Sequence, residues 1–142
     1  MPDRNGKIFY TSIASLSHIS KDAGVETSLE YAVFQNYGYM GLYGGLKAQN
    51  IKERKGLKKS QNILDHMGYE ELAANLFRAT QTEAKLRRDH IQGKQEANQT
   101  HYEVGKKVRQ TIKDLGGTMP ENLPTPEKSI QQIEREEKKK LP

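Results

Sequence analysis

Apolar residues recur at helical spacing in several segments that glycines separate. Ile13, Leu16 and Ile19 lie about one turn apart, and their segment ends at Gly24. This spacing predicts a first helix, with the glycine as its stop. No stretch of useful length alternates between apolar and polar residues, and no internal repeat occurs at a fixed period. The pattern therefore favours an all-α fold.

Three further helices are predicted before the middle of the chain. Thr27 with Glu30 three positions later fits a capping box and begins a helix that runs toward a glycine-rich stretch. Glycines end a short basic helix over 46–56 and another over 60–68. Strong helix formers and apolar positions predict a longer helix over 69–91.

The most regular pattern follows Gly93, where apolar positions step by three and four residues. Such a narrow seam suits one partner helix, supplied either by the preceding helix or by a second copy of the protein. The opposite side carries a basic stripe at the same spacing, Lys106, Arg109 and Lys113. The seam comprises Ala97, His101, Val104, Val108 and Leu115.

Beyond the seam, glycines and prolines interrupt the helical pattern. We expect a linker over 118–125, and Thr125 followed by Pro126 resembles a helix start, which predicts a charged C-terminal helix and tail over 126–142. A helical core domain over 18–117 then precedes the linker. The predicted architecture is an all-α, compact multi-helix domain with long antiparallel helices and a protruding C-terminal helix.

Composition restricts the class of protein. The 142 residues contain no cysteine, and only 34% are hydrophobic. The absence of cysteine suits a reducing compartment. No apolar run approaches the roughly 20 residues of a membrane span or forms a signal peptide. The sequence therefore predicts a cytoplasmic protein without a membrane partner.

The net charge of +5 resides in one segment. Residues 46–60, the basic segment, contain six basic residues and one acid, whereas the rest of the chain is neutral. Charge concentrated in this way favours a polyanion partner, although a charge run is often only solvated surface. The candidate nucleic-acid contacts are Lys47, Lys52, Arg54, Lys55, Lys58 and Lys59, with Lys106, Arg109 and Lys113 of the stripe in support.

The glycine-rich stretch YGYMGLYGG, residues 37–45, precedes the basic segment. Its glycine spacing matches neither phosphate-loop pattern, which disfavours nucleotide hydrolysis. Tyr37, Tyr39 and Tyr43 are candidates for stacking on unpaired bases. The interpretation favoured over stacking is that the glycines permit close helix contact or a sharp turn, and that the tyrosines fill the space around it.

Nothing in the sequence indicates catalysis. The histidines are scattered, the acidic residues lie mostly among bases on expected solvated faces, and no nucleophile elbow occurs. We therefore expect a protein that is not an enzyme, with no metal, no cofactor and no small-molecule substrate.

Four phrases carry a family resemblance: GLYGGL, RKGLKKSQNILDHMG, ELAANLFRATQTE and GGTMPENLPTPEKSI. From about Ser20 to Glu136 the chain closely resembles the C-terminal half of the bacterial DNA-damage-inducible protein D family. The resemblance implies a protein of the DNA-damage (SOS) response under the damage-responsive repressor. It also implies no known enzymatic activity and a role around DNA or the recombination machinery.

The beginning of the chain departs from this family pattern. Members normally start with a separate domain similar to the N-terminal domain of phage and baculovirus antirepressor-type proteins, often regarded as DNA-binding. Residues 1–17, MPDRNGKIFYTSIASLS, do not resemble the end of that domain. We interpret 1–17 as an atypical leader that is either foreign or the product of truncation or rearrangement.

Two functional hypotheses follow. In the first, the basic segment and the stripe bind DNA or a recombinase–DNA filament. In the second, the seam and the C-terminal helix form a protein-interaction module, such as a homodimer, without direct DNA contact. Within the resemblance, the stretch 37–45 is expected to shape the turn that presents Lys52 to Lys59.

Overall fold

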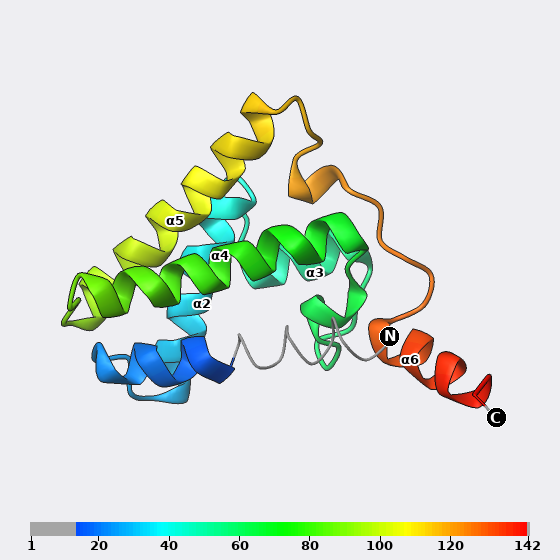
Figure 1. Ribbon diagram of the computed structural model, residues 1–142, viewed down its shortest axis with the longest axis horizontal. Coiled ribbons are helices and arrows are strands. Elements are labelled where there is room, and N and C mark those ends of the chain that lie inside the picture. Colours follow the sequence, from blue (N-terminus) through cyan, green and yellow to red (C-terminus); the bar gives the residue numbers. More distant parts are fainter. Residues whose placement is uncertain (1–13, 142) are drawn as a thin grey trace.

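The computed structural model describes residues 14–141, and every regular element in that range is a helix, which confirms the all-α prediction (Figure 1). Residues 14–22 are helical, and this segment precedes α2 (Ser28–Leu42), α3 (Ala48–Lys55), the short 3-10 helix η1 (Ile63–His66), α4 (Tyr69–Arg88), α5 (Lys94–Asp114), the single turn η2 (Pro120–Asn122) and α6 (Ile130–Lys139).

The first helical segment belongs to the folded domain. Leu16 is fully buried in a cluster that also contains Phe34 of α2 and Leu86 of α4. The boundary that the sequence suggested between residues 17 and 18 therefore falls inside a packed helix. The first thirteen residues of the proposed leader, with Ile13, lie outside the described part of the chain.

Helix α2 runs through most of the glycine-rich stretch. It begins at the predicted capping box, in which the Thr27 hydroxyl accepts the Glu30 N–H and the Glu30 carboxylate accepts the Thr27 N–H. Only the last residues of the stretch form a turn, where Gly44 and Gly45 have positive φ values of 66° and 103°. Gly38 and Gly41 instead lie within the helix.

These two helical glycines allow α2 to pack closely against α5. A Cβ atom on Gly41 would lie 2.2 Å from the Tyr102 carbonyl oxygen, and one on Gly105 of α5 would lie 2.7 Å from the Gly38 carbonyl oxygen. The two helix backbones therefore meet without intervening side chains. The predicted close helix contact is confirmed, whereas a turn built by the whole stretch is not.

The seam on α5 is occupied within the chain. Ala97, His101, Val104 and Val108 are buried, and α5 packs chiefly against α2 and to a smaller extent against the preceding helix α4. These four positions are thus unavailable to a second copy. Leu115 is wrongly included in the seam, because α5 ends at Asp114 and the Leu115 side chain is 82% exposed.

Two other helix predictions need correction. The segment 60–68 forms only the four-residue η1, which begins after Asn62 rather than at Ser60. Helix α6 begins after Ser129, which forms a capping box with Gln132, and not at the predicted start at Thr125. A capping side chain decides each start, because it satisfies backbone N–H groups that the helix leaves free. Asn62 accepts the Leu64 N–H, and Ser129 accepts the Gln132 N–H.

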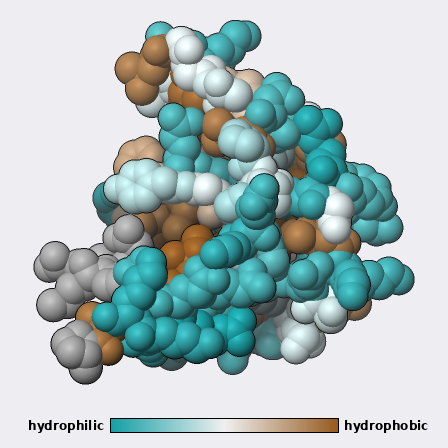
Figure 2. Space-filling model, turned by 90° about the vertical axis from the view of Figure 1, so that its right-hand side faces the viewer, coloured by the Kyte–Doolittle hydropathy of each residue, from teal (hydrophilic) through white to brown (hydrophobic). Residues whose placement is uncertain are grey.

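The arrangement in Figure 1 explains where surfaces form. Helices α4 and α5 diverge from the short turn at 89–93, and α6 lies apart from α5 at the other end of the molecule. No side chain of α6 is buried, and its Gln131 N–H donates to Asp65 of η1. The view from the α6 end shows hydrophilic side chains over most of that face, with smaller hydrophobic patches between them (Figure 2).

Candidate nucleic-acid interface

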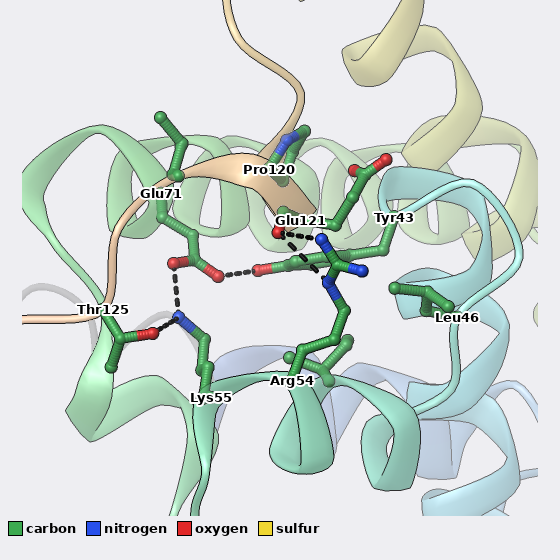
Figure 3. A pocket seen from close by; sticks show the side chains of 10 residues that line it. Tyr43, Leu46, Arg54, Lys55, Glu71, Pro120, Glu121 and Thr125 are labelled. Carbon is green, nitrogen blue, oxygen red and sulfur yellow. Dashed lines mark hydrogen bonds and ion pairs between the residues drawn. The ribbon is translucent and has the colours of Figure 1, made fainter.

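The structure divides the predicted basic residues into two groups, those that bind partners inside the protein and those that remain exposed. Lys55, Arg54 and Arg109 belong to the first group. Their partners come from α4 and from residues 119–125, which we call the strap. The strap crosses the open side of α3 and forms one wall of a cavity of about 230 Å³ (Figure 3).

Lys55 forms a buried ion pair. Its Nζ lies 2.7 Å from Glu71 Oε1, and the two side chains are 6% and 1% exposed. The other Glu71 oxygen accepts a hydrogen bond from the Tyr43 hydroxyl. Removing one partner of such a pair leaves an uncompensated charge in the interior. Lys55 is therefore a structural residue, and its assignment as a nucleic-acid contact is corrected.

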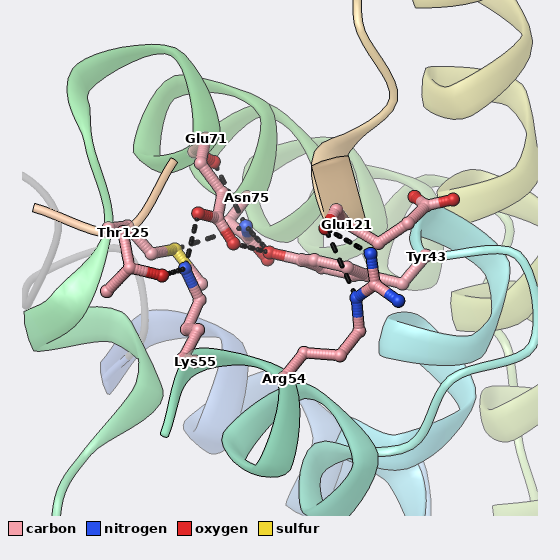
Figure 4. A network of polar contacts seen from close by, with 8 residues as sticks. Tyr43, Arg54, Lys55, Glu71, Asn75, Glu121 and Thr125 are labelled. Atoms are coloured by element: carbon pink, nitrogen blue, oxygen red, sulfur yellow. Dashed lines mark hydrogen bonds and ion pairs between the residues drawn. The ribbon is translucent and has the colours of Figure 1, made fainter. Parts of the chain in front are cut away.

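Glu71 is the first of several polar residues that continue into the core along α4 (Figure 4). Asn75 donates to the Tyr43 hydroxyl and to the Glu71 carbonyl oxygen, both at 3.0 Å. Asn75 Oδ1 in turn accepts a hydrogen bond from Arg78 at 3.2 Å. Lys55, on the strap side, is thus linked by hydrogen bonds to a guanidinium group that has no exposed surface.

Arg78 meets His101 of α5 at the far end of this network. A guanidinium nitrogen of Arg78 contacts His101 Nε2, and His101 Nδ1 lies 2.8 Å from the Phe34 carbonyl oxygen. Burial, reinforced by the charge of Arg78, holds the pKa of His101 well below its usual value. The imidazole is therefore neutral, with Nδ1–H donating to Phe34 and Nε2 accepting from Arg78.

Two of the three candidate stacking residues lie in this interior. Tyr43 takes part in the network, and the Tyr39 ring lies 5.0 Å below the Arg78 guanidinium carbon. Both are buried, at 5% exposure or less, so neither ring can receive a base. The stacking prediction is wrong for Tyr39 and Tyr43, because they fill the core beside the glycine contact. Tyr37 is half-buried.

Arg54 and Arg109 hold the strap in place from two helices. Arg54 of α3 donates from Nε and a terminal nitrogen to the Glu121 carbonyl oxygen, at 3.2 and 2.9 Å. Arg109 of α5 donates to the two Glu121 carboxylate oxygens, at 2.7 and 2.9 Å. Residues 118–125 therefore pack on the core through the strap and do not form an open linker.

The Arg109–Glu121 pair is partly shielded from solvent. The two side chains are 26% and 15% exposed. Partial burial opposes ionisation of Glu121, but the hydrogen bond from Arg109 and the charges of Arg109 and Arg54 outweigh it and lower the Glu121 pKa. The hydrogen bond to Glu121 in turn raises the Arg109 pKa. Both groups are charged at neutral pH.

The remaining predicted basic residues face solvent or are half-buried. Lys52 is half-buried and donates to the Lys59 carbonyl oxygen at 2.8 Å. Lys106 lies 5.8 Å above the Tyr102 ring. Five of the predicted basic residues are exposed lysines without a carboxylate partner among the described residues: Lys47, Lys58, Lys59, Lys106 and Lys113.

The packing of the helices helps to bring the basic segment and the basic stripe of α5 together. Arg54 belongs to the basic segment and Arg109 to the stripe, yet both bind Glu121. Lys106 and Lys113 share the face of α5 that carries Arg109, since they lie three and four residues from it. The sequence identified both groups as basic, but it gave no signal for Glu121 as their common partner.

Sequence reasoning also missed the polar residues buried on α4. Acidic residues were assigned mostly to solvated faces, whereas Glu71 is only 1% exposed. The spacing of Glu71, Asn75, Arg78 and Thr82 by three and four residues marks one helix face, but hydrophobic periodicity does not detect a polar stripe. The apolar Phe77 on the same helix is instead 51% exposed.

No three metal-ligating side chains gather within residues 14–141 in a way that could hold a metal ion. None of the helices in this range is long and apolar enough to cross a membrane.

Comparison with known proteins gives a consistent family match. The family model for the DinD C-terminal domain matches residues 9–133. DNA damage-inducible protein D of Escherichia coli (strain K12) is 65% identical over 119 residues, which are 84% of this chain and 43% of that protein. The chain thus spans less than half the length of this relative. No solved structure matches significantly.

Proposed function

This chain belongs to the DinD C-terminal domain family, and from that premise we propose that it binds the phosphate backbone of DNA through its exposed lysines. Membership of this family implies a role in the DNA-damage response. The proposal is that the role is non-enzymatic and that the protein holds DNA, either bare or within a recombinase filament.

The observation that supports this proposal is the set of unpaired lysines. Lys58 and Lys59 follow α3, Lys47 precedes it, and Lys106 and Lys113 lie on α5. Exposed ammonium groups without a carboxylate partner can pair with phosphates and release counterions from DNA. Such contacts position a nucleic acid but carry no sequence information. We therefore expect little sequence preference.

The same reasoning assigns the protein to the bacterial cytoplasm, where the DNA lies. A chain without cysteine suits that reducing compartment.

Fluorescence anisotropy with labelled single-stranded and duplex DNA, measured across a salt series, tests the proposal. We expect affinity to fall steeply as salt rises. In the variant K58Q/K59Q, two lost phosphate contacts should reduce the salt slope by roughly 1.5. The control K21Q/K139Q removes the same charge from exposed positions elsewhere, and circular dichroism verifies the fold of each variant.

Three outcomes are informative. No binding to either DNA at about 50 mM salt, where electrostatic contacts are strong, would contradict the proposal. So would an equal loss of affinity in K58Q/K59Q and in the control. Binding only to recombinase-coated DNA, with a shallow salt slope, would identify the protein filament as the partner instead of bare DNA.

A second candidate function is self-association, and two exposed apolar side chains favour it. Leu115 and Phe77 line a hollow of about 330 Å³ between α4 and α5. Light scattering at micromolar concentration should then show a mass above that of the monomer, and L115S should lower it. A strictly monomeric protein would contradict this candidate.

A further inference from the structure

The Glu121 carboxylate fills a cationic site on α5. It binds Arg109 through two parallel contacts of 2.7 and 2.9 Å, one to each oxygen. The same Arg109 nitrogen that makes the shorter contact also donates to the Leu42 carbonyl oxygen, at 3.2 Å, which fixes the guanidinium against the end of α2. The site is therefore preorganised by the fold.

A planar guanidinium recognises carboxylates and phosphates with the same two-point geometry. Glu121 consequently presents to Arg109 the arrangement of oxygens that a phosphodiester would present. The flanking residues strengthen the comparison, because Lys106 and Lys113 lie on the same face of α5, are exposed and have no carboxylate partner among the described residues. Three cations at helical spacing thus follow one another, and only the central one is neutralised.

The backbone of the strap is held independently of the Glu121 carboxylate. Pro120 is fully buried, and Arg54 binds the Glu121 carbonyl oxygen and the Asn122 side chain. Thr125 accepts a weaker hydrogen bond from Lys55, at 3.4 Å. The Glu121 side chain can therefore rotate away from Arg109 while the strap stays in place. Figures 3 and 4 show the contact of Arg54 with the Glu121 carbonyl oxygen.

We propose that Arg109 is a phosphate-binding residue of this protein and that Glu121 occupies its site in the absence of nucleic acid. A DNA phosphate and the Glu121 carboxylate then compete for one guanidinium group. This inference rests on the proposed DNA-binding function and adds a regulation to it, since the strap lowers affinity until a phosphate displaces the carboxylate.

The test is DNA binding by E121Q, compared with E127Q. Both substitutions remove one negative charge near the strap, but Glu127 is exposed and has no partner among the described residues. E121Q should gain one phosphate contact, which makes its salt slope steeper by roughly 0.7 to 0.9 than that of E127Q. With this difference in slope, the ratio of the E121Q affinity to the E127Q affinity should be roughly five- to eight-fold larger at 0.1 M salt than at 1 M.

The double variant R109Q/E121Q shows whether the gain passes through Arg109. It should lose the additional slope and return to the affinity of R109Q or below it. E121A provides a second means of releasing the guanidinium, and thermal unfolding monitored by circular dichroism verifies that each variant is folded.

The outcomes separate the two proposals. If the unmodified protein binds DNA but E121Q has the same affinity and salt slope as E127Q, the proposal that Glu121 competes with phosphate is overturned. The proposed DNA-binding function then stands. The same conclusion follows if R109Q/E121Q keeps the gain of E121Q. If neither the unmodified protein nor E121Q binds DNA at low salt, both proposals fail.

Discussion

Arg78 is a charged residue without exposed surface, and its neighbours supply only neutral groups. They are the Asn75 amide oxygen, the His101 imidazole and the face of the Tyr39 ring. Arg78 Nε has no hydrogen-bond partner among the described residues. A buried charge is costly unless hydrogen bonds surround it, so the neutral state of His101 is part of what makes this interior stable.

The low pKa of His101 predicts that acid destabilises the protein. The unfolded imidazole titrates near pH 6.5, whereas the folded one stays neutral well below that value. Below pH 6.5 the unfolded state binds the additional proton, so stability is complete above this pH and is lost as pH falls toward the folded pKa. The loss from this residue should approach about 1.4 kcal/mol per pH unit.

Denaturant unfolding at pH 5, 6 and 7 measures this dependence. H101Q should show a flatter dependence of the unfolding free energy on pH, whatever its overall stability. H90N is the matched control, because His90 is exposed and asparagine tolerates its positive φ of 51°. Equal pH dependence in H101Q and in the unmodified protein would contradict the prediction.

At the scale of elements, the packing of α2 against α5 depends on glycine. A Cβ at Gly41 would meet a backbone oxygen of α5, which cannot move aside as a flexible side chain could. We predict that G41A lowers the free energy of unfolding by about 2 kcal/mol, as overpacking outweighs the roughly 1 kcal/mol by which alanine favours a helix over glycine.

Urea denaturation of G41A beside A32V tests this prediction. Ala32 is exposed on the same helix, so the added methyl groups of A32V meet no neighbouring helix. A32V should cost no more than about 0.7 kcal/mol, the propensity difference between ordinary residues. If G41A is as stable as the unmodified protein, α2 and α5 can move apart at little cost in free energy. The close contact between them is then not required for stability.

Helix α4 shows what the sequence could and could not predict at this scale. Its existence and approximate length follow from its composition, but its apolar positions do not reveal the polar residues that are buried on it. The buried face carries Glu71, Asn75 and Arg78, which satisfy one another and residues on other elements. Hydrophobic periodicity identifies apolar residues that are expected to be buried. It cannot identify polar residues that are buried because distant residues complete their hydrogen bonds.

At the scale of the whole molecule, the contacts that define the candidate site join residues far apart in the chain. Arg54 and its strap partner Glu121 are 67 positions apart, as are His101 and Phe34. The sequence predicted the basic segment and the stripe correctly as concentrations of charge. It could not predict that Lys55, Arg54 and Arg109 are paired internally, because each acidic or carbonyl partner lies on an element whose position depends on the complete fold.

The strap also determines how far the domain extends. If the chain stopped at Gly117, the guanidinium groups of Arg54 and Arg109 would lose Glu121, the residue that now binds both. The cavity would keep Arg54 and Lys55 in its lining, with Glu71 as the remaining acid. Repulsion between the two unpaired guanidinium groups would then push α3 away from α5. The charges of the domain are therefore balanced only when the strap is included.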